Sequence, residues 1–258
     1  MTDDLPPLEM SIARNLAGKV RTIIDEAVKI TPGLPASEEA QKLVARRMPP
    51  EWLPKYEVMD NYGFVVWDEI MTILDRVLAY PYVTLYRKHL VHAPKDVIRA
   101  WQFHSHSLRV GELYIVLDRT VELLKFLAVV GKDVGLSITN QQKSFEKAFK
   151  KTFKRHLQER HRLTHAHERQ SLTSRTVDFA GGKWTDNESE SATALTAHAA
   201  MLFELFREVS KKAGYETMNT LEDIVTHHEL TAQREARQML DQIGKALFET
   251  LNIGIDGP

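Results

Sequence analysis

The sequence predicts an all-α fold, a four- or five-helix bundle with an N-terminal helical arm. Two observations lead to this prediction. The 258 residues include only 12 glycines, and apolar residues recur at helical spacing while the alternation typical of strands is hard to find. Apolar residues make up 43% of the chain and cysteine is absent. A chain of this size buries a core without disulfides, and its lack of thiols excludes cysteine nucleophiles and thiolate metal sites.

The sequence predicts two helices separated by prolines in the N-terminal part of the chain. Apolar residues follow helical spacing over residues 8–30. Ser37, followed by two glutamates, is a typical N-cap for a short helix that runs toward Arg47. Five prolines end or interrupt these segments: Pro32, Pro35, Pro49, Pro50 and Pro54. We therefore predict a helical arm over 1–58, packed on the main body or on a partner chain, and a helical bundle domain over 59–258.

The bundle domain contains the remaining expected helices. They span residues 60–79, 96–130, 190–213 and 221–252, and one further helix follows Gly131 and Gly135, which are stop signals. Ser137 or Thr139 is expected to cap that further helix, which continues through a basic run to Arg169. Residues 170–190 lack helical spacing and are expected to form a long loop.

Charge is distributed unevenly along the chain, although the formal net charge is only −1. Between Lys143 and Arg169 there are nine Lys or Arg against three Glu, a balance of +6. From Asp178 to Pro258 there are seven basic residues against fourteen acidic ones, a balance of −7. A basic segment in an acidic protein is either an anion site, such as one for a phosphate backbone, or a solvated helix face.

The most unusual segment is KRHLQERHRLTHAHER, from Lys154 to Arg169, which holds four of the eleven histidines and four arginines. If the helix is continuous, it places one set of side chains near a single stripe: Phe145, Phe149, Phe153, His156, Arg160, Leu163 and His167. An arginine and a histidine that point into a bundle are costly unless they are paired or bind something.

Within this segment, Arg160-His161-Arg162-Leu163-Thr164-His165 fits an R-x4–6-H pattern late on a helix. The pattern resembles that of the HEPN superfamily, with His161 in place of the family's usual Asn. The resemblance covers about residues 96–252. It implies a small helical bundle, often dimeric, whose Arg and His cleave RNA without a metal ion. It also implies a role of toxin–antitoxin or phage-defence type.

This resemblance assigns Arg160 and His165 as candidate catalytic residues, and helix geometry favours His167 as the alternative to His165. Five further residues are candidates for binding phosphate or RNA: Lys154, Arg155, His161, Arg162 and Arg169. Arginine offers a fork of donors to a phosphate, and histidine transfers protons near neutral pH. We expect no cofactor and no bound metal, and we expect a homodimer that acts on RNA, with an antitoxin or another protein as a further partner.

Two other interpretations remain open at this point. His161, His165 and His167 lie close enough on a helix to ligate a metal ion, although no carboxylate stands at a recognisable ligand spacing. Alternatively, the chain is a non-catalytic dimerisation or binding module. In that case Arg160 pairs with an acid on another helix, and His156 and His167 are satisfied interior histidines. The acids considered for that pairing are Asp118, Glu112 and Glu204.

The sequence predicts a cytoplasmic protein without a membrane span. The N-terminal stretch MTDDLPPLEM is acidic and lacks the basic and apolar regions of a secretory signal. The most apolar stretch, from Val110 to Gly131, carries five charged side chains and is a poor candidate for crossing a bilayer.

Overall fold

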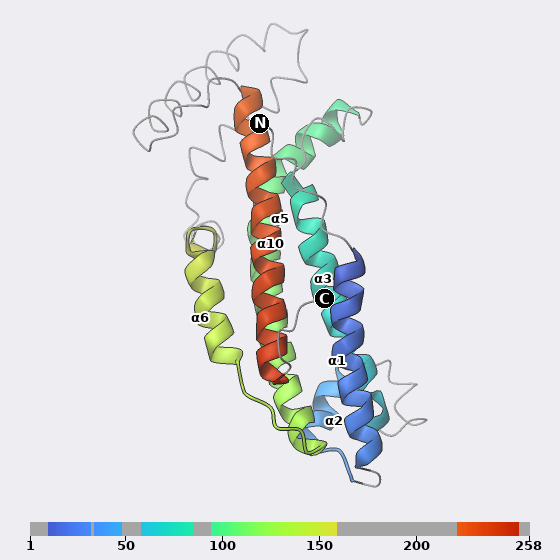
Figure 1. Cartoon of the computed structure of the whole chain (residues 1–258). Helices are drawn as coiled ribbons and strands as arrows, with labels where there is room; N and C mark the ends of the chain where they lie inside the picture. The colour runs from blue at the N-terminus through green and yellow to red at the C-terminus, as the bar shows by residue number, and fades with distance from the viewer. Residues whose placement is uncertain (1–9, 32–33, 48–57, 85–93, 159–220, 253–258) are drawn as a thin grey trace, which may run out of the picture. The chain divides into compact units, whose positions relative to one another are not determined.

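The computed structural model describes residues 10–31, 34–47, 58–84, 94–158 and 221–252 (Figure 1). Within these ranges the chain forms α-helices, short 3-10 helices and turns, and contains no strand. The all-α class expected from the sequence is therefore confirmed for this part of the chain. No helix in these ranges is long and apolar enough to cross a membrane.

Apart from α6, the bounds of the described helices agree closely with the expected segments. The α-helices are α1 Met10–Ile30, α2 Glu38–Ala45, α3 Tyr62–Ala79, α5 Lys95–Asp133, α6 Gln142–Thr152 and α10 Leu221–Thr250, and the 3-10 helices are η1 Met59–Asn61 and η2 Tyr80–Thr84. Helix α5 is one continuous helix of 39 residues that runs through Gly111. The expected helix over 190–213 and the expected loop over 170–190 lie outside the described residues.

The chain divides into two compact units. The first comprises 1–78, 114–153 and 237–258, and the second comprises 79–113 and 154–236. Helices α5 and α10 each contribute residues to both units. Residues of the expected arm belong to the first unit together with parts of α5, α6 and α10, and a domain boundary at residue 58 stays a prediction.

In the first unit, one carboxylate ties the expected arm to α3 and α5. Ser37 caps α2 by accepting a hydrogen bond from the Ala40 backbone N–H at 3.2 Å. Its own N–H and hydroxyl donate to Asp133 Oδ2 at 3.0 and 2.9 Å, and Tyr62 Oη donates to the same oxygen at 2.7 Å. Burial and then the bond to Asp133 raise the pKa of the Tyr62 phenol, so it remains a donor. The Ser37 cap expected from the sequence is confirmed.

Helix α5 ends in a Schellman motif at one of the two expected glycines. Gly135 has a φ of 71°. Its N–H donates to Lys132 O at 3.4 Å, and the N–H of Leu136 donates to Gly131 O at 2.8 Å. Glycine adopts such a φ without strain because it has no Cβ. Gly131 has a different reason to be glycine, because a Cβ there would overlap the side chain of Ile138.

Helix α6 begins later and ends earlier than expected. Its N-cap is Gln141, and it ends at Thr152, where Phe153 departs from helical geometry with φ −101° and ψ 20°. The prediction of one continuous helix to Arg169 is therefore wrong, since helical geometry resumes only at Lys154. Ser137 and Thr139 do not cap α6.

These two residues instead bind the C-terminal end of α10. The N–H of Thr139 donates to Thr250 O at 3.0 Å, and its hydroxyl donates to Asn252 Oδ1 at 3.2 Å. Asn252 Nδ2 donates to Ser137 O at 2.6 Å. The turn before α6 satisfies backbone groups that helix ends leave open.

Candidate functional site

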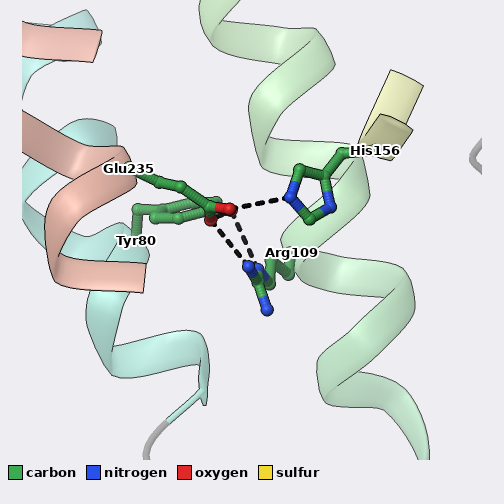
Figure 2. A network of polar contacts seen from close by, with 4 residues as sticks. All are labelled: Tyr80, Arg109, His156 and Glu235. Atoms are coloured by element: carbon green, nitrogen blue, oxygen red, sulfur yellow. Dashed lines mark hydrogen bonds and ion pairs between the residues drawn. The ribbon is translucent and has the colours of Figure 1, made fainter. Parts of the chain in front are cut away.

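The second unit contains a buried network of four polar side chains, Tyr80, Arg109, His156 and Glu235 (Figure 2). Arg109 Nη2 and Tyr80 Oη both donate to Glu235 Oε2, each at 2.7 Å. Arg109 Nε donates to Tyr80 Oη at 2.9 Å. His156 Nε2 lies 2.7 Å from Glu235 Oε1. Both carboxylate oxygens of Glu235 therefore have partners.

The four side chains come from four segments that are far apart in the sequence. Tyr80 begins η2, where Pro81 prevents α3 from continuing as a regular helix. Arg109 lies on α5 beside the buried Val110, and Glu235 lies on α10 beside the buried Ala236. His156 lies in the helical turn over 154–158. The apolar faces of these helices bring the polar groups inside, where they need partners.

Burial and the contacts within this network act in opposite directions on the pKa values of Glu235 and Arg109. The side chains of Arg109, Glu235 and His156 are 7%, 10% and 22% exposed, and Tyr80 is fully buried. Burial alone would raise the pKa of Glu235, but the hydrogen bond from His156, the charge of Arg109 and the Tyr80 bond outweigh it and lower that pKa to about 2. Glu235 is therefore ionised at neutral pH.

Tyr80 and Arg109 stay in the protonated states in which they can donate to the Glu235 carboxylate. Burial is the largest influence on the Tyr80 phenol and raises its pKa, so the hydroxyl stays protonated and donates. Burial disfavours the charge of Arg109, but its contacts with Tyr80 and Glu235 outweigh burial and raise its pKa. The Arg109 guanidinium also lies 5.9 Å from the centre of the Tyr80 ring, within the range of a cation–π interaction.

The arrangement fixes side chains more readily than it transfers protons. A general acid or base must reach a substrate proton, directly or through one water. Glu235 and Tyr80 instead face each other and Arg109 inside the unit. The network thus anchors the turn over 154–158 to α10. This turn is the start of the segment from Lys154 to Arg169, called here the Arg/His segment.

Only two of the eight residues that the sequence singled out are described. Lys154 and Arg155 are exposed, on the turn where His156 points inward. The other six lie outside the described residues, and their roles stay predictions: Arg160, His161, Arg162, His165, His167 and Arg169. Phe145, Phe149 and Phe153 of the expected stripe are buried, although the helix on which the stripe was projected breaks at Phe153.

Sequence reasoning missed Tyr80, Arg109 and Glu235. It did consider that His156 is a satisfied interior histidine, and the bond to Glu235 agrees with that alternative. A signal existed for Arg109 and Glu235, because each is a charged residue at a helix position whose neighbours at i+1 and i+4 are apolar. Periodicity alone could not pair them, since 126 residues separate the two positions.

Neither a metal cluster among the described residues nor a known relative assigns a role to this network. Within the described ranges, no group of three or more His, Asp or Glu side chains is placed to hold a metal ion. No family model, no curated protein and no solved structure matches the chain.

Proposed function

We propose that the chain is an RNA-directed helical protein of HEPN-like architecture, a metal-independent endoribonuclease that acts as a cytoplasmic homodimer in a toxin–antitoxin or phage-defence setting. One observation supports this proposal most strongly. At the start of the Arg/His segment, Lys154 and Arg155 are exposed, while His156 is held by the buried Glu235. The turn therefore presents cations to solvent from an anchored position, as a phosphate-binding segment requires.

The proposed reaction is cleavage of RNA by its own 2′-hydroxyl. A base removes the 2′ proton, the 2′ oxygen attacks phosphorus, and the bond to the 5′ oxygen breaks as an acid protonates that oxygen. The products are a 2′,3′-cyclic phosphate and a 5′-hydroxyl. We assign the proton-transfer role to His165, with His167 as the alternative, and a positioned group of this kind contributes roughly 10²–10⁴-fold in rate. Arg160 holds the phosphate through its fork of donors.

The test is cleavage of end-labelled RNA by the purified full chain in EDTA. We expect cyclic-phosphate products from the wild type and their loss in His165→Ala/His167→Ala. His92→Ala/His198→Ala removes the same number of histidines outside the segment and serves as the matched control. A cleavage rate that is unchanged in the His165→Ala/His167→Ala variant would overturn the assignment, and activity that needs added zinc would favour the metal-binding alternative instead.

A second candidate is a module that binds RNA without cutting it. The observation that favours it is the pairing of His156 with Glu235 at 2.7 Å, because this inward histidine of the segment serves packing. Retained RNA binding by a wild-type protein that forms no cyclic-phosphate product would select this candidate.

A further inference from the structure

Helix α6 carries a row of exposed lysines on the face opposite its buried phenylalanines. Lys143, Lys147, Lys150 and Lys151 are all exposed. At 100° per residue these four positions fall within an arc of about 100°. Residues 143, 147 and 151 follow one another at a spacing of four, so each step advances about 6 Å along the helix. The row is therefore a linear array of ammonium groups.

The helix that carries this row is firmly attached to the first unit. Phe145 and Phe149 are buried with ring centres 5.5 Å apart, and Phe149 and Phe153 lie 4.6 Å apart. Gln242 Nε2 on α10 donates to Thr152 Oγ1 at 2.9 Å. Since α6 itself is held in place, binding to the row requires ordering only of the lysine side chains, which limits its entropic cost.

The carboxylates of the described residues compensate the charge of this row only in small part. Helix α6 contains one acid, Glu146, which pairs with Lys150. Glu146 also lies close enough to Lys125 on α5 to favour the charge of that lysine, whose pKa is raised chiefly by its hydrogen bond to Glu122. No described carboxylate forms an ion pair with Lys143, Lys147 or Lys151. Within the described part of the chain, these three side chains therefore leave a positive charge without an acidic partner.

We infer that the lysine row of α6, defined as Lys143, Lys147, Lys150 and Lys151, is a binding surface for the phosphate backbone of single-stranded RNA. It contacts the backbone without reading the bases, because ammonium groups are point charges that carry no base-specific pattern. The choice of RNA as the polyanion rests on the proposed function. Sequence reasoning considered the whole basic segment from Lys143 to Arg169 as an anion site and named individual phosphate contacts only from Lys154 onward. The lysine row lies before those residues, on a separate helix.

The composition of the face favours a nucleic acid over a membrane. A helix that lies on a bilayer inserts its apolar face between the lipids. The apolar face of α6 is already occupied, because Phe145 and Phe149 are buried within the first unit. The exposed face offers only lysines with small or polar neighbours such as Ser144 and Ala148. An anionic lipid surface would therefore gain electrostatic contacts alone.

The test measures binding of a fluorescent 20-nucleotide poly(U) RNA across a salt series, in the full chain carrying Arg160→Ala so that the RNA stays intact. Lys147→Gln/Lys151→Gln should reduce the slope of log K against log salt by about 1.4, because each phosphate contact on a single strand contributes about 0.7. At 0.1 M salt the loss of affinity is then roughly 25-fold.

The matched control is Lys29→Gln/Lys245→Gln, which removes the same charge from exposed lysines on α1 and α10. We expect its slope to equal that of the parent protein. Thermal unfolding of all three proteins checks that the fold is retained. Equal slopes in the two lysine variants would overturn the inference, and so would an absence of RNA binding or a preference for vesicles of anionic lipid over RNA.

The outcome is separable from that of the proposed function. Cleavage in EDTA that depends on His165 and His167, with no slope change in Lys147→Gln/Lys151→Gln, would leave the ribonuclease proposal standing and remove the α6 surface. The opposite result, a reduced slope in a protein that never cuts RNA, would keep the α6 surface and remove the ribonuclease.

Discussion

The network around Glu235 and the lysine row of α6 place charge in opposite ways. In the network, one cation and one carboxylate are buried together, and a phenol and an imidazole complete their hydrogen bonds. In the row, Lys143, Lys147 and Lys151 remain exposed, and among the residues that the structure describes only Lys150 is paired with an acid. Charges arranged in the first way hold a fold together, and charges arranged in the second way remain available to a ligand.

The largest expected effect comes from removing the carboxylate at the centre of the network. Glu235→Ala leaves Arg109 buried and without its acidic partner, so we expect the free energy of unfolding to fall by about 3–5 kcal/mol. Urea unfolding measures this loss. Glu249→Ala removes a carboxylate from the same helix whose side chain is 39% exposed and lies 3.7 Å from Lys245, and it should cost less than about 1 kcal/mol. Similar losses in the two variants would refute the contrast between buried and exposed charge.

Acid should weaken the network before it affects the lysine row. The pKa of Glu235 is about 2 in the folded chain against an ordinary value of 4.5. A lowered carboxylate pKa contributes stability above pH 4.5, and this contribution disappears as the pH falls toward 2. Between pH 5 and pH 3 we expect Glu235 to account for about 2 kcal/mol of lost stability. The stability of Glu235→Gln should depend less on pH in this window, and an identical dependence would contradict the assignment.

A milder change removes one hydroxyl from the network. Tyr80→Phe deletes a fully buried hydroxyl that donates to Glu235 and accepts from Arg109 Nε. We expect the free energy of unfolding to fall by about 1–3 kcal/mol. Tyr62→Phe is the matched control in the first unit. Asp133 keeps two donors from Ser37 there, so a loss of about 1 kcal/mol is expected. A larger loss in Tyr62→Phe would reverse the ranking of the two sites.

The smallest effect on stability is expected in the lysine row. Lys147→Gln/Lys151→Gln removes exposed charges and should change the free energy of unfolding by less than about 0.5 kcal/mol. The same variant should show the reduced salt slope for RNA. Loss of stability comparable to that of Tyr80→Phe would show that these lysines support the fold.

The helices were predictable from the sequence because local signals determine them. Ser37 marked the start of α2 through its capping hydroxyl, and Gly135 marked the end of α5 through its positive φ. The break at Phe153 was not predictable in this way, because neither proline nor glycine stands there. Phe153 is buried, so its position is fixed by packing against other parts of the fold. The residues next to it in the sequence do not reveal that packing.

The candidate site was also predictable only in part, for the features that local sequence determines. The exposure of Lys154 and Arg155 and the inward direction of His156 follow from helical periodicity. The partner of His156 does not, because Glu235 lies 79 residues further along the chain. Sequence reasoning considered Asp118, Glu112 and Glu204 as partners for Arg160. In the described network the paired arginine is instead Arg109, and its partner is Glu235.

The most direct test of the proposed ribonuclease is the rate of RNA cleavage in EDTA by the wild-type chain and by Arg160→Ala, measured at saturating RNA. We predict cyclic-phosphate products from the wild type, and a rate reduced at least about 100-fold in Arg160→Ala, with unchanged thermal stability. Equal rates in the two proteins, or no cleavage by a folded wild type, would contradict the proposed function.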